Sequence, residues 1–165
     1  MTVRSVPPRF RDPQLTSYTF LTSVLVRCPR CAAPARIGPL PETAHGGTAA
    51  SGGQRRVLCP GCGLSRRAGR GPVFRYGPGP AVDPWFGFPL WLQARTRHGV
   101  LWAYNLEHLD LIRRFVAASL RERAPWYETG RKMTAVARLP AWVQRAGNRD
   151  EVLRAIDRAR GSLLH

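Results

Sequence analysis

The C-terminal half of the chain carries the clearest helical periodicity of apolar residues. One stripe of apolar positions follows Asn105, a helix-capping residue type, and stops before Pro125, which predicts a helix between these residues. A second stripe follows Asn148, with Glu151 three positions later as in a capping box and Gly161 at the exit, which predicts the last helix. The inward positions are Leu109, Ile112, Val116 and Leu120 in the first helix, and Val152, Ala155, Ile156 and Ala159 in the second.

The residues before and between these helices give further elements. Two apolar segments, 89–93 and 100–104, flank the polar residues 96–99, and this spacing with a glycine predicts a β-hairpin. The segment Arg131–Leu139 is predicted to be helical, and Pro140 interrupts it and starts a new turn.

Short strands separated by glycine, proline and small polar residues are predicted in the N-terminal half. Prolines make residues 1–19 an irregular arm, and the Gly/Ala/Ser/Thr-rich residues 43–54 favour a flexible loop. The predicted strands are Phe20–Arg27, 35–37, Arg55–Leu58 and Val73–Tyr76.

Composition and charge restrict the location and the class of partner. No apolar run is long enough to cross a membrane, and the N-terminus lacks the pattern of a secretory signal, so a reducing cytoplasmic location is predicted. The net charge is +16, which favours a polyanionic partner, nucleic acid first and an acidic membrane surface second. The competing interpretation is a compositional bias, since Lys132 is the only lysine and the remaining basic residues are arginine.

All four cysteines occur in Cys-x-x-Cys pairs, Cys28 with Cys31 and Cys59 with Cys62. Two such pairs, each preceded by a predicted strand, can place four thiolates around one ion at Zn–S distances of roughly 2.3 Å, with no position left for a substrate. We therefore predict one structural Zn²⁺. The alternatives are a redox pair, a disulfide, or iron in the same four-thiolate geometry.

Residues 20–76, through these cysteines, the prolines after Cys28 and Cys59, and Gly63, resemble the zinc ribbon at the N-terminus of transcription factor IIB and of many bacterial proteins. The C-terminal half is similar to bacterial zinc-ribbon proteins that are described only by their ribbon. The resemblance implies a ribbon fold and supplies no activity, since such ribbons contact DNA, RNA and proteins alike.

Arginines surround the second cysteine pair without an intervening acidic residue. Side by side, their guanidinium groups would suit phosphate oxygens, whereas the alternative is a solvated basic surface. These candidate nucleic-acid-binding residues are Arg55, Arg56, Arg66, Arg67 and Arg70.

An aromatic group could be a base-stacking platform, but we expect it to be part of the core. It consists of Trp85, Phe86, Phe88 and Trp91.

A catalytic group is not evident in the sequence. Asn105 and His108 would be neighbours on a helix and could mark a site, but helix capping and packing explain both. No Gly-rich phosphate loop, nucleophile elbow or paired-carboxylate pattern occurs. We therefore predict that the protein is not an enzyme, and no small-molecule substrate is evident.

These elements together predict an α+β protein with an N-terminal zinc β-ribbon and a β-hairpin packed with two or three helices. The predicted organisation is an irregular arm at 1–19, a zinc ribbon at 20–80 and a hairpin and helical core domain at 81–165. The expected function is nucleic-acid binding through phosphate contacts. The alternative is a protein-interaction adaptor whose ribbon docks a partner in a larger transcription or defence complex.

Overall fold

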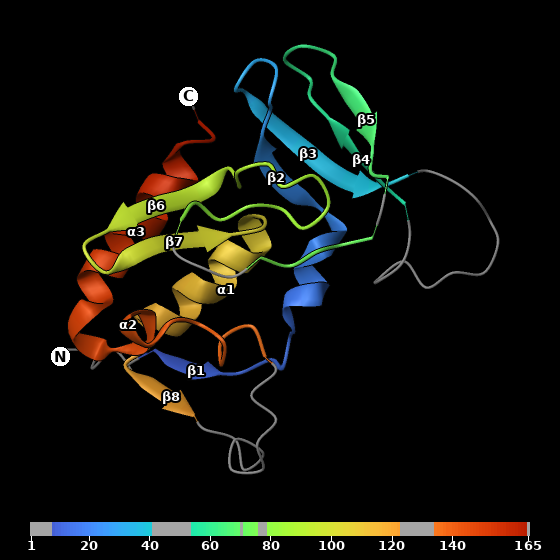
Figure 1. The fold of residues 1–165 in the computed structure, drawn as a ribbon. Coiled ribbons are helices and arrows are strands. Elements are labelled where there is room, and N and C mark those ends of the chain that lie inside the picture. The colour runs from blue at the N-terminus through green and yellow to red at the C-terminus, as the bar shows by residue number, and fades with distance from the viewer. Residues whose placement is uncertain (1–7, 41–53, 70, 76–78, 123–133, 165) are drawn as a thin grey trace, which may run out of the picture.

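Three small sheets and three α-helices make up the computed structural model, which describes residues 8–40, 54–69, 71–75, 79–122 and 134–164 (Figure 1). The α+β prediction is confirmed. The strands are β1 (Arg9–Arg11), β2 (Val24–Arg27), β3 (Pro34–Pro39), β4 (Arg55–Leu58), β5 (Ser65–Arg67), β6 (Leu92–Thr96), β7 (Gly99–Ala103) and β8 (Leu120–Glu122). The helices are α1 (Leu106–Ala117), α2 (Ala141–Gln144) and α3 (Arg149–Gly161), with 3-10 turns η1 (Ser17–Thr22) and η3 (Ala146–Asn148).

The predicted hairpin is formed by β6 and β7, which pair antiparallel from Leu92 opposite Ala103 to Thr96 opposite Gly99. Its first strand begins at Leu92, later than the predicted segment 89–93. Helices α1 and α3 pack against each other and against the hairpin (Figure 1). Among the described segments, none of the helices has both the length and the apolar character needed to cross a membrane.

Helix α1 begins as predicted and ends earlier. Asn105 is its N-cap, and the predicted positions Leu109, Ile112 and Val116 are buried. The helix stops at Ala117, because the backbone of Ala118 is extended and the chain continues into β8. The prediction of Leu120 on the helical stripe is therefore wrong: it lies in β8 and is 46% exposed. Strand β8 pairs in parallel with β1, which lies within the predicted irregular arm.

Helix α3 has the predicted inward face, with Val152, Ala155, Ile156 and Ala159 all buried. The predicted capping box is wrong. Asn148 occupies the N-cap position, but its side-chain amide donates to the carbonyl of Trp142 at 2.9 Å instead of capping the helix. Glu151 accepts a hydrogen bond from the backbone N–H of Arg97 in the hairpin turn. The side chains of Asn148 and Glu151 therefore make tertiary contacts instead of capping the helix.

Three predicted elements in irregular regions need correction. Only Val24–Arg27 of the predicted segment Phe20–Arg27 forms a strand, and residues 20–22 belong to η1, which buries the consecutive side chains of Phe20 and Leu21. Residues 71–75 form no strand, and Tyr76 lies outside the described residues. Residues 134–139 form turns rather than the predicted helix Arg131–Leu139, whose first three residues also lie outside the described part. The new turn predicted at Pro140 is confirmed as α2.

The four-stranded sheet β2-β3-β4-β5 lies at one end of the molecule and the helices at the other (Figure 1). Strand β2 connects them through its backbone: the Leu25 N–H donates to Tyr104, and the Leu25 carbonyl accepts from Trp91. Buried residues of the sheet, such as Val26 and Ile37, belong to one hydrophobic cluster with those of the hairpin and helices. The domain boundary near residue 80 remains a prediction.

Candidate functional site: metal centre and arginine face

Each cysteine pair lies in a tight turn between two strands, the first between β2 and β3 and the second between β4 and β5. In the first turn, the Cys28 N–H donates to the carbonyl of Ala33 at 2.9 Å, and the Ala32 N–H donates back to the carbonyl of Cys28 at 2.9 Å. The second turn repeats both bonds within Cys59–Leu64, again at 2.9 Å. The two turns are therefore equivalent knuckles, each presenting two sulfur atoms.

The knuckles bring all four cysteine Sγ atoms within 4.8 Å of one another. Cys28 and Cys62 are 3.6 Å apart at sulfur, and Cys31 and Cys59 are 3.5 Å apart. A disulfide requires about 2.05 Å, whereas a tetrahedron with Zn–S bonds of roughly 2.3 Å has edges of about 3.8 Å. The four cysteines thus suit a structural metal site, for which zinc is the best fit.

The protonation of the thiols also favours a bound cation. Burial raises the pKa of Cys28, but backbone N–H groups of Cys31 and Arg30 and the neighbouring sulfur atoms outweigh this and lower the pKa to about 6. The backbone N–H of Ala33 lowers the pKa of Cys31, but burial and the three other sulfurs raise it to about 12. Because neighbouring thiols cannot all ionise together at neutral pH, a divalent cation is needed to keep four thiolates in this space.

The two knuckles have different residue types at the position after the second cysteine. The residue after each second cysteine adopts a left-handed conformation, with φ of 62° at Ala32 and 70° at Gly63. Glycine accepts this conformation freely, whereas an L-residue is strained in it. The first knuckle therefore adopts the same turn at a cost in free energy.

Exchanging the residue types at these two positions should change stability in opposite directions. Gly63→Ala should reduce the free energy of unfolding of the zinc-loaded protein by about 1 kcal/mol, and Ala32→Gly should leave it unchanged or raise it by up to about 1 kcal/mol. A methyl group at Gly63 would meet no atom within 4 Å, so the loss reports backbone strain rather than a clash. Urea unfolding measures both values. A neutral Gly63→Ala variant would contradict the equivalence of the knuckles.

The structure does not bring the five candidate arginines into one patch. Arg55 is 2% exposed, and its guanidinium lies 4.8 Å from the centre of the Trp85 ring. A buried guanidinium cannot reach an external phosphate, so the inclusion of Arg55 in a surface patch is corrected. Arg66 is exposed, and its guanidinium carbon lies 5.7 Å from the ring centre of Phe86 and 5.7 Å from that of Phe88. Arg70 lies outside the described residues.

The remaining arginines share the outer face of the four-stranded sheet. Strand register places Arg56 opposite Arg67, and Arg36 opposite Leu58. Opposed residues, and residues two apart on a strand, point to the same side. Arg36, Arg56 and Arg67 therefore lie on one side of the sheet, which we call the arginine face. Arg36 was missed by sequence reasoning, although its place between the buried Ala35 and Ile37 is the alternation expected of an outward residue.

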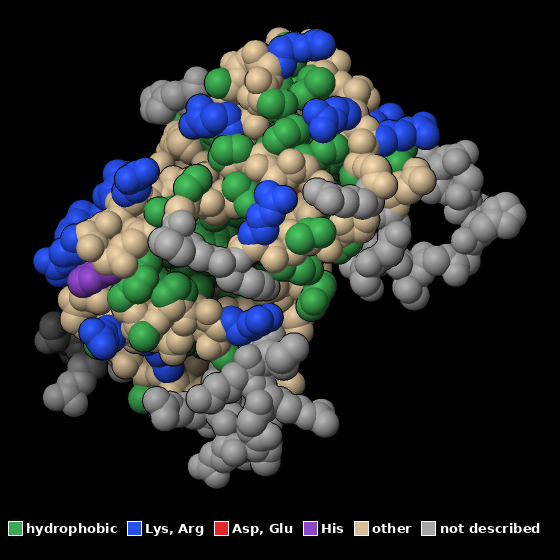
Figure 2. All heavy atoms as spheres, in the orientation of Figure 1, with side chains coloured by type: hydrophobic (Ala, Val, Ile, Leu, Met, Phe, Trp, Pro, Cys, Tyr) green, Lys and Arg blue, Asp and Glu red, His purple; other side chains and the backbone are tan. Residues whose placement is uncertain are grey.

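The arginine face lies in a region without acidic compensation. None of the described residues of the four-stranded sheet and its knuckles is Asp or Glu. In contrast, the helices and the hairpin carry ion pairs such as Arg113 with Asp157 and Arg160 with Asp110. On the side of the molecule drawn in Figure 2, basic side chains are spread among apolar ones, and no acidic side chain is visible.

The aromatic group is part of the hydrophobic cluster or packs against it. Trp85 is buried in the core, and Phe86, Phe88 and Trp91 pack against it, which confirms the packing interpretation. The Asp83 carboxylate accepts the backbone N–H groups of Trp85, Phe86 and Phe88 and so holds this loop.

Capping and packing also account for Asn105 and His108. The Asn105 side-chain oxygen accepts the N–H of His108 at 2.9 Å, and its amide donates to the carbonyls of Phe20 at 3.0 Å and Ser23 at 2.9 Å. His108 stacks on Phe20 with ring centres 4.6 Å apart. This pair joins α1 to the segment that leads into β2.

No protein-family model matches the chain, and comparisons with curated proteins and with solved structures also find no match. The metal centre and the arginine face therefore rest on geometry and chemistry alone. The four cysteines agree with the zinc-ribbon resemblance noted from the sequence.

Proposed function

We propose that this protein is a zinc-ribbon nucleic-acid-binding protein that contacts phosphates through the arginine face. The observation that carries the proposal is the strand register that places Arg36, Arg56 and Arg67 on one side of the sheet. A ribbon of the transcription factor IIB type, held by zinc at Cys28, Cys31, Cys59 and Cys62, would present these side chains on a stiff platform. No catalytic role is proposed.

Phosphate chemistry suits this face. A guanidinium offers paired N–H donors that match two phosphate oxygens, and it remains charged at all physiological pH values. Arg36, Arg56 and Arg67 come from three adjacent strands, which lie about 4.8 Å apart in a sheet. Because such contacts read the backbone rather than base edges, the expected binding has little sequence preference and depends strongly on salt.

Removing the arginine face should weaken nucleic-acid binding more than an equal loss of charge elsewhere. The test variant carries Arg36→Ala, Arg56→Ala and Arg67→Ala. The control variant carries Arg114→Ala, Arg145→Ala and Arg154→Ala, which are exposed arginines of the helical part. Fluorescence anisotropy with a short duplex DNA and a single-stranded RNA, across a range of salt concentrations, measures affinity and salt dependence.

The test variant should lose at least tenfold in affinity, and its log–log salt slope on duplex DNA should fall by about 2 to 3, since each phosphate contact contributes roughly 0.9. The control should change both values much less. Metal content must stay at one zinc per chain in both variants, so that misfolding is distinguished from lost contacts. Equal losses of affinity in the two variants would show that binding depends on net charge rather than on the arginine face, and would favour the protein-adaptor function.

A further inference from the structure

The row of outward arginines extends beyond the arginine face onto strand β2. Strand register places Leu25 opposite Arg36, and Arg27 lies two residues further along β2, so its side chain is on the same side of the sheet as Arg36. Each of the four strands therefore contributes one arginine to this side. With strands about 4.8 Å apart, the row from Arg27 to Arg67 is about 14 Å wide, which spans several phosphates of a nucleic-acid strand.

Trp91 continues this row beyond β2. Val26 forms an antiparallel bridge with Leu90. The Trp91 N–H donates to the Leu25 carbonyl at 2.9 Å, so this segment pairs with β2. The pairing puts Trp91 on the same side as Leu25 and Arg27. The guanidinium carbon of Arg27 lies 5.0 Å from the centre of the Trp91 ring, which is a cation–π arrangement.

A cavity of about 340 Å³ lies beside Arg27 and Trp91. This volume is within the range of roughly 300–1,000 Å³ that is typical of small-molecule sites. The hairpin contributes Gln93, Arg95 and Val100 to the lining. Among the described residues that line the cavity, none is Asp or Glu, so its two guanidinium groups make the lining positively charged.

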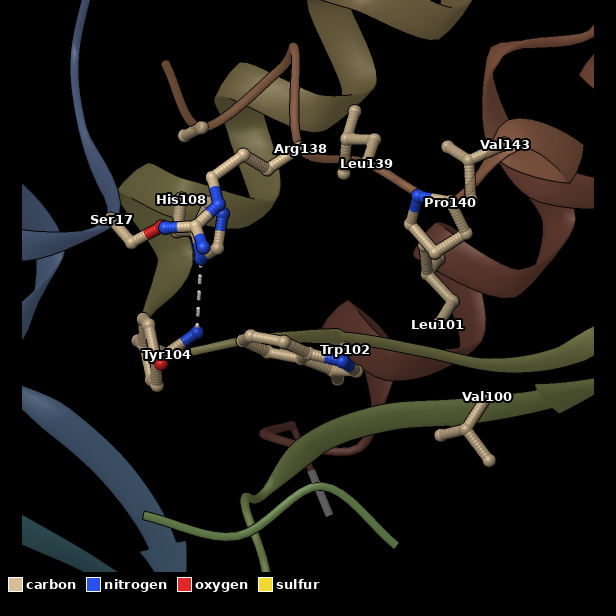
Figure 3. Close-up of a pocket in the computed structure, with 11 residues that line it drawn as sticks. Ser17, Val100, Leu101, Trp102, Tyr104, His108, Arg138, Leu139, Pro140 and Val143 are labelled. Atoms are coloured by element: carbon tan, nitrogen blue, oxygen red, sulfur yellow. Dashed lines mark hydrogen bonds between the residues drawn. The ribbon is translucent and has the colours of Figure 1, made fainter. Parts of the chain in front are cut away.

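A second cavity, drawn in Figure 3, lies between the hairpin, α1, η1 and the segment around α2. The described residues that line it, such as His108, Leu139 and Val143, belong neither to the arginine face nor to its extension through Arg27 and Trp91. Of these two cavities, only the one beside Trp91 continues the row of arginines.

The cavity beside Trp91 suits a nucleobase flanked by phosphates. A base can stack on an indole ring or on a guanidinium plane, and the lining offers both in Trp91 and Arg27. Arg95 is exposed, and within the described part of the chain its guanidinium makes no hydrogen bond or ion pair. Arg95 is therefore available to a phosphate next to the bound base.

The lining has little means of selecting one particular base. Gln93 has the side-chain type that reads base edges, but its amide is engaged within the protein. Its Oε1 accepts the backbone N–H of Ala81 at 3.3 Å, and its Nε2 donates to the carbonyl of Leu90 at 2.6 Å. We therefore expect the cavity to accept different bases with similar affinity.

From this arrangement we propose that the protein binds single-stranded nucleic acid, with phosphates along the row of arginines and one unpaired base in the cavity beside Trp91. The bases of a duplex are paired and stacked inside the helix, so one of them could enter the cavity only after a costly extrusion. A single strand presents its bases without this cost. The inference rests on the proposed function and specifies which form of nucleic acid the protein prefers.

Fluorescence anisotropy of the zinc-loaded full chain tests the inference with three ligands, each about 12 nucleotides long. They are a single-stranded DNA of mixed sequence, an abasic strand with the same number of phosphates, and a blunt-ended duplex DNA. The base-containing single strand should bind at least about fivefold more tightly than the abasic strand, because it adds the stacking of a base. It should also bind more tightly than the duplex at the same salt concentration, although the duplex has the higher charge density.

Two variants locate the base and its phosphate. Trp91→Leu keeps an apolar side chain but removes the ring, so it should lower the affinity for the base-containing strand to nearly that for the abasic strand. Arg95→Ala should reduce the log–log salt slope for single strands by about 0.7. Arg154→Ala removes the same charge from an exposed residue that does not line the cavity, and it should leave the slope nearly unchanged. Thermal unfolding and zinc content check that each variant is folded.

Equal affinities of the wild-type protein for the base-containing and abasic strands would overturn the inference, but would leave phosphate binding by the arginine face intact. Tighter binding of the duplex than of the base-containing single strand would have the same consequence. A folded Trp91→Leu variant that still discriminates fully between the two single strands would exclude this cavity as the base site. Absence of binding to all three ligands would overturn the proposed function and this inference with it.

Discussion

Replacing Cys59 by serine should reduce the metal content of the purified protein from one zinc per chain to none. Cys59 is buried, and its Sγ is 3.5 Å from that of Cys31, so the substitution removes an inner ligand without adding bulk. Binding of a structural zinc contributes on the order of 10 kcal/mol, which is enough to decide whether a small β-unit folds. Native mass spectrometry of freshly reduced protein measures the stoichiometry.

The helical part should survive this loss. Helices α1 and α3 pack against the hairpin, away from the cysteines, so the far-UV signal of helix should change little. In hydrogen exchange, the amides of β4 and β5 should lose protection first. The amide of Leu25 in β2 should stay more protected, because it donates to Tyr104 at the end of the hairpin.

Ser65→Ala is the matched control, since Ser65 lies next to the second knuckle and is exposed. This variant should retain one zinc. Less than about half an equivalent of metal in the wild-type protein, or an unchanged metal content in Cys59→Ser, would contradict the four-cysteine site. Cooperative loss of all helix on metal removal would show that the sheet and the helices form a single folding unit.

Asn105→Ala should be the most destabilising substitution outside the metal site and the apolar core, with a loss of about 3 kcal/mol or more in the free energy of unfolding. The buried Asn105 side chain caps α1 and also donates to two backbone carbonyls, those of Phe20 and Ser23. Alanine removes the cap and leaves both carbonyls without this donor. Urea unfolding of the zinc-loaded protein measures the loss.

Asn148→Ala is the matched control, since it is the same substitution at the other predicted cap. Within the described part of the chain, Asn148 makes no capping bond and donates only to Trp142, so the expected loss is about 1 kcal/mol. Asn105→Asp separates the two roles, because it keeps an acceptor for the cap but removes the donor. It should lose most of the stability that Asn105→Ala loses. Equal effects of the two alanine variants would contradict the special role of Asn105.

Local features of the sequence predicted a large part of the structure. The Cys-x-x-Cys spacing identified the four cysteines that the fold brings together at the candidate metal site, and the capping residue Asn105 marked the start of α1. The same holds for the inward positions of α3 and for the hairpin, in which Gly99 follows the turn as the first residue of β7. These features depend on residues within a few positions of one another, where backbone geometry alone restricts the outcome.

Other predictions failed where distant segments compete for the same residues. The predicted apolar stripe of α1 included Leu120, but this residue lies beyond the helix in β8, which pairs with β1 from the opposite end of the chain. The capping box at Asn148 and Glu151 was replaced by contacts with Trp142 and Arg97. A local capping bond is worth about 1 kcal/mol, so tertiary hydrogen bonds readily outweigh it.

The sequence by itself determined the two cysteine pairs of the candidate metal site and an excess of arginine around them, but only the tertiary structure decided which arginines reach solvent. Arg55 and Arg56 are adjacent in the chain, yet Arg55 lies buried on Trp85 while Arg56 joins Arg36 and Arg67 on the outer face. Successive residues of a strand point to opposite sides, and the side that is buried depends on what packs against the sheet. That packing partner, the loop around Trp85, is distant in sequence, so whether each arginine is buried or exposed follows from the fold.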